Sequence, residues 1–166
     1  SNMKLANGFS DVPRMLGTGI SVCIGTDGAA SNNSLNLFRE MSVEALIHKG
    51  LKKDAVTVSA SDVLKMATIG GARALGRENE LGQLKEGYKA DIALLDLNCP
   101  QLMPGNNLVS ALVYSCSGNE VDTVLVNGKI LMEKREVKTI DEEKLYFEME
   151  RIGSRYMRLK RERSQK

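Results

Sequence analysis

The 166-residue sequence has little of what several classes of protein require. It contains one histidine, three cysteines and no tryptophan. A zinc hydrolase with a complete site of its own needs two or three histidines, so this chain cannot hold a histidine-rich metal site. Cys23, Cys99 and Cys116 form no Cys-x-x-Cys spacing, which excludes a disulfide scaffold and a zinc knuckle. Free thiols of this kind predict a reducing, cytoplasmic location.

Net charge and hydrophobic runs exclude two further classes. The formal net charge is +2, which is too small to indicate a nucleic acid or an anionic membrane as partner. No apolar run approaches the roughly 18 residues of a membrane-spanning helix. The length suits about one domain, and the 42% of hydrophobic residues suffices to bury a core. We therefore expect a folded protein with neither nucleic acid nor membrane as partner.

Residues 21–27 (Ser-Val-Cys-Ile-Gly-Thr-Asp) carry the clearest strand signal. A nearly continuous apolar run, bounded by glycines, is formed by Ile20, Val22, Cys23 and Ile24, which is typical of a parallel strand covered on both faces. The run ends in the small, polar loop 27–33. A helix is predicted over residues 34–49, capped by Asn33 or Ser34 and followed by Gly50 at its C-terminal end.

Two more helices are predicted in the first half of the chain. A short one covers residues 12–16, and another runs from an N-cap at Ser61 to Leu75 and ends at Gly76. A strand followed by helices indicates an α/β fold. His48, near the end of the helix over residues 34–49, is interpreted as a surface histidine because no partner ligand is spaced near it.

The middle third predicts a small β unit. Residues 90–96 alternate between apolar and polar side chains, and Asn127-Gly128 separates two β-rich runs within residues 121–137. Asn-Gly is the strongest short signal for a hairpin. A short helix is expected near residues 107–116.

The end of the chain predicts an amphipathic helix over residues 141–163. Its apolar residues step by four and three and form one stripe: Leu145, Met149, Ile152, Tyr156 and Leu159. Residues 151–166 carry seven basic groups and one acidic group. Such charges fit either a nucleic-acid clamp or a solvated helix face whose stripe packs on the body. The second is favoured because Tyr156 is the only aromatic residue among them and the charges flank an apolar stripe.

Asp27 is the sharpest candidate for chemistry. Side chains at the C-terminal ends of barrel strands face the active site, where an aspartate binds a metal, acts as a base or merely forms the next turn. Position alone leaves these alternatives open. The loop is not a P-loop, because it has no Gly-Lys-Ser/Thr, and not a calcium loop, because Phe38 stands where a bidentate glutamate belongs.

Several segments in order along the chain resemble the amidohydrolase superfamily. Residues 1–8 look like the loop after the seventh barrel strand, and residues 25–33 (Gly-Thr-Asp-Gly-Ala-Ala-Ser-Asn-Asn) look like the end of the eighth. Residues 66–76 resemble the last barrel helix. Residues 81–92 and 121–129 resemble the β-sandwich that follows the barrel. The likeness is greatest to the branch of 5′-methylthioadenosine and S-adenosylhomocysteine deaminases, with chlorohydrolases related.

The resemblance implies an α/β fold made of the C-terminal fragment of a TIM-type (β/α)8 barrel, part of a small β-sandwich domain and a C-terminal helix. Residues 1–78 would be the last part of the metal-dependent barrel. Residues 79–140 would be the β-sandwich portion with a short helix, and residues 141–166 the amphipathic helix packing on the barrel. Residues 1–3 continue into the family's loop, so the resemblance implies that they are mid-protein sequence. A full barrel needs about 250 residues, so this chain would carry only its last part.

The resemblance also implies a mechanism. In the family a divalent metal, usually zinc, is held by a His-x-His pair, a further histidine and the eighth-strand aspartate. Asp27 would therefore be the metal ligand and the catalytic and substrate-contacting residue of this chain, and would accept a proton from the attacking water. Zinc hydroxide would attack the purine of S-adenosylhomocysteine or 5′-methylthioadenosine, a small-molecule nucleoside substrate, and release ammonia.

The remaining ligands of that family have no counterpart here. We expect zinc or another divalent metal in the full-length enzyme, but neither metal binding nor activity in the fragment alone. Because a cut barrel leaves residues 21–27 without neighbours, we expect a homo-oligomer. The alternatives left open are a guanine or cytosine deaminase, a triazine chlorohydrolase, and a non-catalytic stand-alone binding module.

Overall fold

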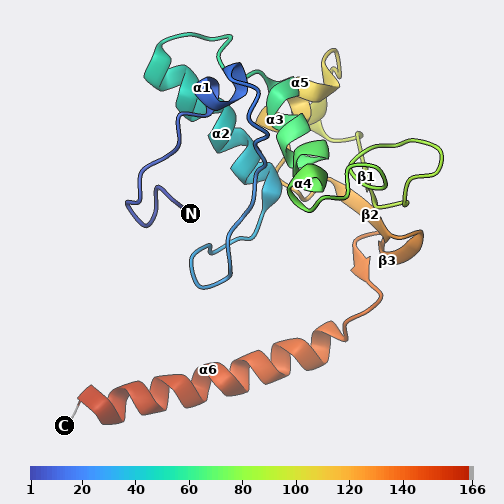
Figure 1. The fold of residues 1–166 in the computed structure, drawn as a ribbon. Helices are drawn as coiled ribbons and strands as arrows, with labels where there is room; N and C mark the ends of the chain where they lie inside the picture. Colours follow the sequence, from blue (N-terminus) through green and yellow to red (C-terminus); the bar gives the residue numbers. More distant parts are fainter. Residues whose placement is uncertain (165–166) are drawn as a thin grey trace.

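The computed structural model describes residues 1–164 and shows a helical part, a small sheet and a projecting C-terminal helix (Figure 1). The elements, in chain order, are α1 (Val12–Gly17), α2 (Leu37–Lys52), α3 (Ala60–Ala67), α4 (Ile69–Ala74), β1 (Ile92–Leu95), the 3-10 turn η1 (Pro100–Leu102), α5 (Leu108–Tyr114), β2 (Val121–Val126), β3 (Lys129–Glu133), β4 (Glu136–Val137) and α6 (Glu142–Ser164). Within the described residues, none of the helices combines the length and the apolar character needed to span a membrane.

The predicted strand over residues 21–27 is not a strand in the structure. Val22 and Ile24 are half-buried against the helical core, whereas Cys23 is exposed. Burial thus alternates as along a strand, but a strand is completed by ladder hydrogen bonds to neighbours, and no part of residues 1–164 supplies them. The segment instead lies against the helices, where the Ile24 N–H donates to the Met66 carbonyl at 3.3 Å.

Helix α2 begins and ends later than predicted. Its N-cap is Asn36, whose side chain accepts a hydrogen bond from the Arg39 N–H at 3.2 Å. The prediction that Gly50 follows the helix is wrong, because Gly50 lies inside it and Lys53 takes the left-handed conformation at its end, with φ +54°. The left-handed end of the helix thus falls three residues after Gly50, where the Lys53 N–H donates to the Lys49 carbonyl.

The helix predicted over residues 61–75 is divided into α3 and α4 at Thr68. Its N-cap is Ser59 rather than Ser61, because Ser59 and Asp62 form a capping box in which each side chain accepts the backbone N–H of the other. Gly76 ends α4 as predicted, with φ +66°.

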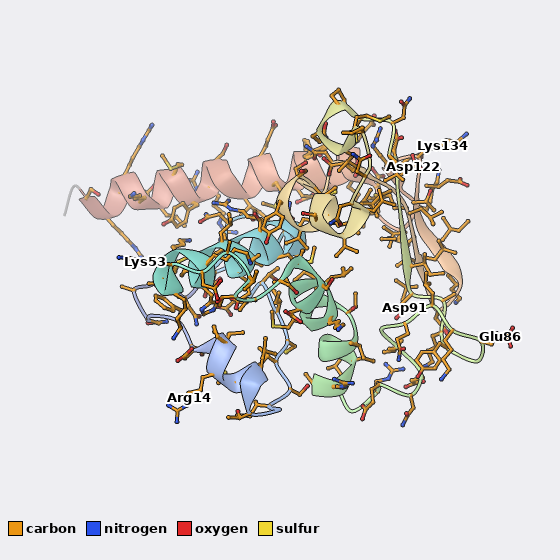
Figure 2. All side chains as sticks on the ribbon, turned by 90° about the horizontal axis from the view of Figure 1, so that it is seen from above. Arg14, Lys53, Glu86, Asp91, Asp122 and Lys134 are labelled. Atoms are coloured by element: carbon orange, nitrogen blue, oxygen red, sulfur yellow. The ribbon has the colours of Figure 1, made fainter. Side chains whose placement is uncertain are left out.

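The four strands form an antiparallel sheet in the order β1-β2-β3-β4. The Asn127-Gly128 hairpin is confirmed. Both residues have positive φ, 50° and 76°, and join β2 to β3 next to the Val126–Lys129 pair. The labelled side chains of Glu86 and Lys134 point outward from the sheet region (Figure 2).

The hydrophobic core lies among α1, α2, α3 and α5. Its buried residues include Val12, Met41, Val63, Met66 and Val113. The short helix predicted near residues 107–116 is confirmed as α5, but its Val113 packs into the helical core rather than against the sheet. The core therefore crosses the domain boundary that we predict at residue 78.

Helix α6 spans 23 residues, as predicted from the stripe, but none of its residues is buried. In Figure 1 it projects from the end of the sheet, away from the other elements. The stripe that was predicted to pack on the body of the chain is exposed in the structure. Lys166, the last basic residue of the predicted tail, lies outside the described residues.

Glu120 is a buried carboxylate that holds the turn before β2. It is 2% exposed and accepts hydrogen bonds from the backbone N–H groups of Ser117 and Gly118, both at 2.9 Å, and from the Gln101 amide at 2.7 Å. Burial by itself raises the pKa of Glu120, but these donors outweigh it and lower that pKa to about 2.

Gly70 provides a test of how α4 packs on residues 21–27. A Cβ at this position would lie 2.6 Å from the Val22 carbonyl oxygen, whereas one at Gly71, in the same helix, would meet nothing within 4 Å. We expect Gly70→Ala to lower the free energy of unfolding by about 1–3 kcal/mol and Gly71→Ala to leave it unchanged or raise it by up to about 1 kcal/mol. Denaturant titration of the two variants measures both values. Equal effects would contradict the close approach.

Glu120 predicts a pH-dependent stability. Its pKa in the folded state, about 2, lies below the ordinary 4.5, so its contribution is complete above pH 4.5 and is lost as the pH falls toward 2. Glu120→Gln places an amide N–H₂ against existing donors, and we expect it to lower stability at pH 7 by about 1–3 kcal/mol. Thermal melting between pH 2.5 and 7 measures the effect, with exposed Glu86→Gln as the control. A Glu120→Gln curve parallel to the wild-type curve would contradict this role.

Candidate functional site

Asp27 lies at the end of the segment that packs on α3 and α4. It is exposed and has φ +61°, a left-handed conformation that is uncommon for a residue other than glycine. Its Oδ1 accepts a hydrogen bond from the N–H of Gly28 at 2.7 Å. Aspartate tolerates this conformation because its short side chain bonds to the adjacent backbone. The turn-forming role considered for Asp27 is therefore present in the structure.

The local hydrogen bonds also set the charge of this group. The backbone N–H of Gly28, and then the hydroxyl of Ser31, lower the pKa of Asp27 below its ordinary value. The carboxyl is therefore ionised at neutral pH, which is the form that binds a cation. The turn and a metal-binding role are compatible, because one carboxylate has lone pairs on both oxygens.

The loop after Asp27 is tied to two other parts of the chain. The Asn32 amide donates to the Thr26 carbonyl and to Glu40 Oε1 of α2, each at 2.8 Å. The Lys4 ammonium donates to the Ser31 carbonyl at 3.0 Å and to Asn33 Oδ1 at 2.6 Å. The motif at residues 25–33 thus has a defined conformation, held by the N-terminal loop and the start of α2.

A cavity of about 390 Å³ lies beside Asp27. Its lining includes Val22 and Ile24 of the apolar segment, Val43 and Ile47 of α2, and Asp27. A concave, mostly apolar space with a few charged groups is the usual form of a small-molecule site.

Among residues 1–164, Asp27 fits one ligand position of a metal centre, and the structure gathers no complete ligand set. Within residues 1–164, no three His, Cys, Asp or Glu side chains come together as a metal-binding group. Zinc in a catalytic site takes three protein ligands and a water. An exposed, ionised carboxylate such as Asp27 is a suitable oxygen ligand, but the other ligands of a complete centre are not among these residues.

His48 is not the surface residue that we predicted. It is 2% exposed and packs edge-on against Phe9, with ring centroids 6.2 Å apart and an interplanar angle of 80°. Its Nε2 lies 2.9 Å from Oε1 of Glu44, but the pair does not have the geometry of a hydrogen bond. The signal for burial was in the sequence, because the steps from Met41 to Ala45 and from Ala45 to His48 are four and three residues, which places all three on one helix face.

A model of the amidohydrolase family matches residues 1–131. Among curated proteins, the chain is 54% identical over 158 residues to a 5-methylthioadenosine/S-adenosylhomocysteine deaminase of Caldanaerobacter subterraneus, covering 95% of this chain and 36% of that protein. It is 52% identical over 158 residues to the protein of the same name from Acetivibrio thermocellus, with 95% and 37% covered. The chain thus spans about a third of the length of these relatives.

Solved structures of zinc-containing enzymes also resemble this chain. An adenosine deaminase from Xanthomonas campestris with bound zinc superposes with a TM-score of 0.89 at 34% identity, covering 93% of this chain and 35% of that one. An atrazine chlorohydrolase from Arthrobacter aurescens, complexed with zinc, superposes with a TM-score of 0.81 at 31% identity, covering 89% and 33%. These superpositions therefore confirm the prediction of an α/β fold related to the TIM barrel.

Proposed function

Because the chain belongs to the amidohydrolase family, we propose that it is the C-terminal part of a metal-dependent hydrolase that deaminates an adenosine-type nucleoside. The substrate we infer is S-adenosylhomocysteine or 5′-methylthioadenosine. The observation that carries this proposal is the identity of 50% or more to proteins named as deaminases of these two compounds, over 95% of this chain. The zinc in two similar structures supports zinc as the cofactor.

Asp27 is the residue of this chain that we assign to the reaction. Its carboxylate would hold the metal from one side and would take the proton of the attacking water. The metal, when bound, supplies the activation of that water. Water adds to the purine carbon that bears the amino group, and ammonia leaves, so the adenosine-type substrate becomes an inosine-type product. The cavity beside Asp27 would form part of the substrate pocket.

Two observations bear on the alternatives. The similarity to an atrazine chlorohydrolase supports a second candidate, displacement of chloride from a triazine ring by the same kind of site. The identity is 31% in that case and 54% for the S-adenosylhomocysteine deaminase, which favours deamination.

We also propose a cytoplasmic location. The three cysteines are free thiols, which supports it because a reducing compartment keeps thiols unpaired.

A chimera tests the proposed function. The residues of this chain would replace the aligned 36% of the Caldanaerobacter subterraneus relative. We expect the purified chimera to contain zinc and to release ammonia from S-adenosylhomocysteine, and the 166-residue chain alone to release none. Asp27→Asn should lower kcat/KM at least about 100-fold and reduce the zinc content, because even the groups that only support metal ligands are worth 10–100-fold.

Asp54→Asn is the matched control for this experiment. Asp54 is also exposed, and its Oδ1 likewise accepts a backbone N–H, that of Val56 at 3.0 Å, but it does not line the cavity. We expect it to leave activity and zinc content unchanged. A folded chimera that is inactive on both nucleosides would contradict the proposed substrate class, and full activity of the Asp27→Asn chimera would contradict the role of Asp27.

We also propose that the isolated chain self-associates. Residues 21–27 have the apolar composition and the alternating burial of a strand but no ladder partners within residues 1–164. Unpaired backbone of this kind is a template for pairing with another chain. Light scattering should report a mass above 18.2 kDa that rises with concentration. A monomer at every concentration would contradict this expectation.

A further inference from the structure

The side chain of Asn32 connects the loop after Asp27 to helix α2. Its amide donates hydrogen bonds to the Thr26 carbonyl and to Oε1 of Glu40, both at 2.8 Å. Its own Oδ1 accepts the N–H of Ser34 at 3.0 Å. A side-chain amide has two N–H donors and one acceptor oxygen, so these bonds use the whole amide group, and turning it over would break all three.

The Thr26 carbonyl controls how the next residue is oriented. It belongs to the peptide group that joins Thr26 to Asp27, and it accepts a second hydrogen bond from the Ser1 hydroxyl at 3.0 Å. Asp27 itself has φ +61°, a left-handed conformation that costs free energy for a residue with a Cβ. Such a conformation persists only where the surrounding structure holds it. The two donors on the Thr26 carbonyl supply that restraint directly before Asp27.

Glu40 gives the Asn32 amide a fixed anchor. It lies in the first turn of α2, where the helix dipole favours a carboxylate, and its side chain is 19% exposed. Within residues 1–164, the lining of the cavity includes Asp27 and Glu40 but not Asn32. Asn32 therefore acts on the candidate site through Asp27, without lining the space in which a substrate would bind.

We propose that Asn32, anchored by Glu40, is a positioning residue that fixes Asp27 in the conformation in which its carboxylate binds the metal. This rests on the proposed role of Asp27 as a metal ligand. Removing a group that orients a metal ligand changes metal affinity or activity about 10–100-fold. Because Asn32 makes no part of the cavity lining, the effect falls on zinc affinity and kcat and not on KM.

Asn32→Ala in the chimera described above tests the proposal. We expect zinc affinity, measured by competition with a chelator, and kcat each to fall about 10–100-fold, with KM changed by less than about twofold. Gln101→Ala is the matched control, because the Gln101 amide likewise donates to a carboxylate, Oε1 of Glu120, at 2.7 Å, and lies outside the cavity lining. It should lower Tm about as much as Asn32→Ala does, and leave zinc affinity and kcat unchanged.

Two variants of the anchor separate positioning from a general loss of stability. Glu40→Gln keeps an oxygen that accepts from the Asn32 amide, so we expect zinc affinity and kcat to stay close to the wild-type values. Glu40→Ala removes that oxygen and should lower both, as Asn32→Ala does. If Asn32→Ala prevents folding of the chimera, the comparison of these two variants decides in its place, and equal zinc affinities would overturn positioning.

A further measurement needs neither metal nor substrate. The three-bond coupling between the amide proton and the Hα of Asp27, measured by NMR in the 166-residue chain, reports the φ of this residue. We expect Asn32→Ala to change this coupling and Gln101→Ala to leave it unchanged. A coupling that is the same in both variants overturns positioning, even where the activity of the chimera falls.

The outcomes separate this proposal from the proposed function. A chimera that deaminates neither nucleoside, but loses zinc affinity with Asn32→Ala and not with Gln101→Ala, supports positioning and contradicts the reaction. An active chimera in which Asn32→Ala and Gln101→Ala behave alike overturns positioning and leaves the reaction intact. If the chimera binds no zinc, the proposed metal role of Asp27 is contradicted, and the coupling of Asp27 alone decides whether Asn32 holds its conformation.

Discussion

The close contact between helix α4 and residues 21–27 is the constraint on which the candidate site depends. Gly70 lies directly against the Val22 carbonyl, and the Ile24 N–H donates to the Met66 carbonyl. These contacts hold an extended apolar segment in place without a neighbouring strand. They place Asp27 in the lining of the cavity, where hydrogen bonds from the Gly28 N–H and the Ser31 hydroxyl lower the pKa of its carboxyl.

Two apolar surfaces of the chain have no neighbouring element to cover or pair with them within residues 1–164. One is the strand-like segment that ends at Asp27, and the other is the stripe of α6. Both would cost free energy if they stayed in water, and both lie in a chain that covers about a third of its relatives. Asp27 is likewise a single carboxylate, and within residues 1–164 no three His, Cys, Asp or Glu side chains come together as a metal-binding group.

Short sequence signals predicted turns and helices correctly where the hydrogen bonds of those elements form between residues close in sequence. Asn127-Gly128 forms its hairpin because both residues tolerate positive φ, and the spacing of Leu145, Met149 and Ile152 predicts a helix that forms. Errors arose where two local signals competed. At α2, Asn36 rather than Ser34 caps the helix and Gly50 is absorbed into it, because capping strength depends on a hydrogen-bond geometry that composition does not describe.

By itself the sequence determined where most of the helices form, the Asn127-Gly128 hairpin, the family resemblance and Asp27 as the residue to examine. Only the tertiary structure decided which of these residues have partners. It buried His48 beneath Phe9, placed Val113 of α5 in the helical core, left residues 21–27 without a ladder and exposed the stripe of α6. The physical reason is that turns and helices are stabilised by residues close in sequence, whereas burial and strand pairing depend on groups far along the chain.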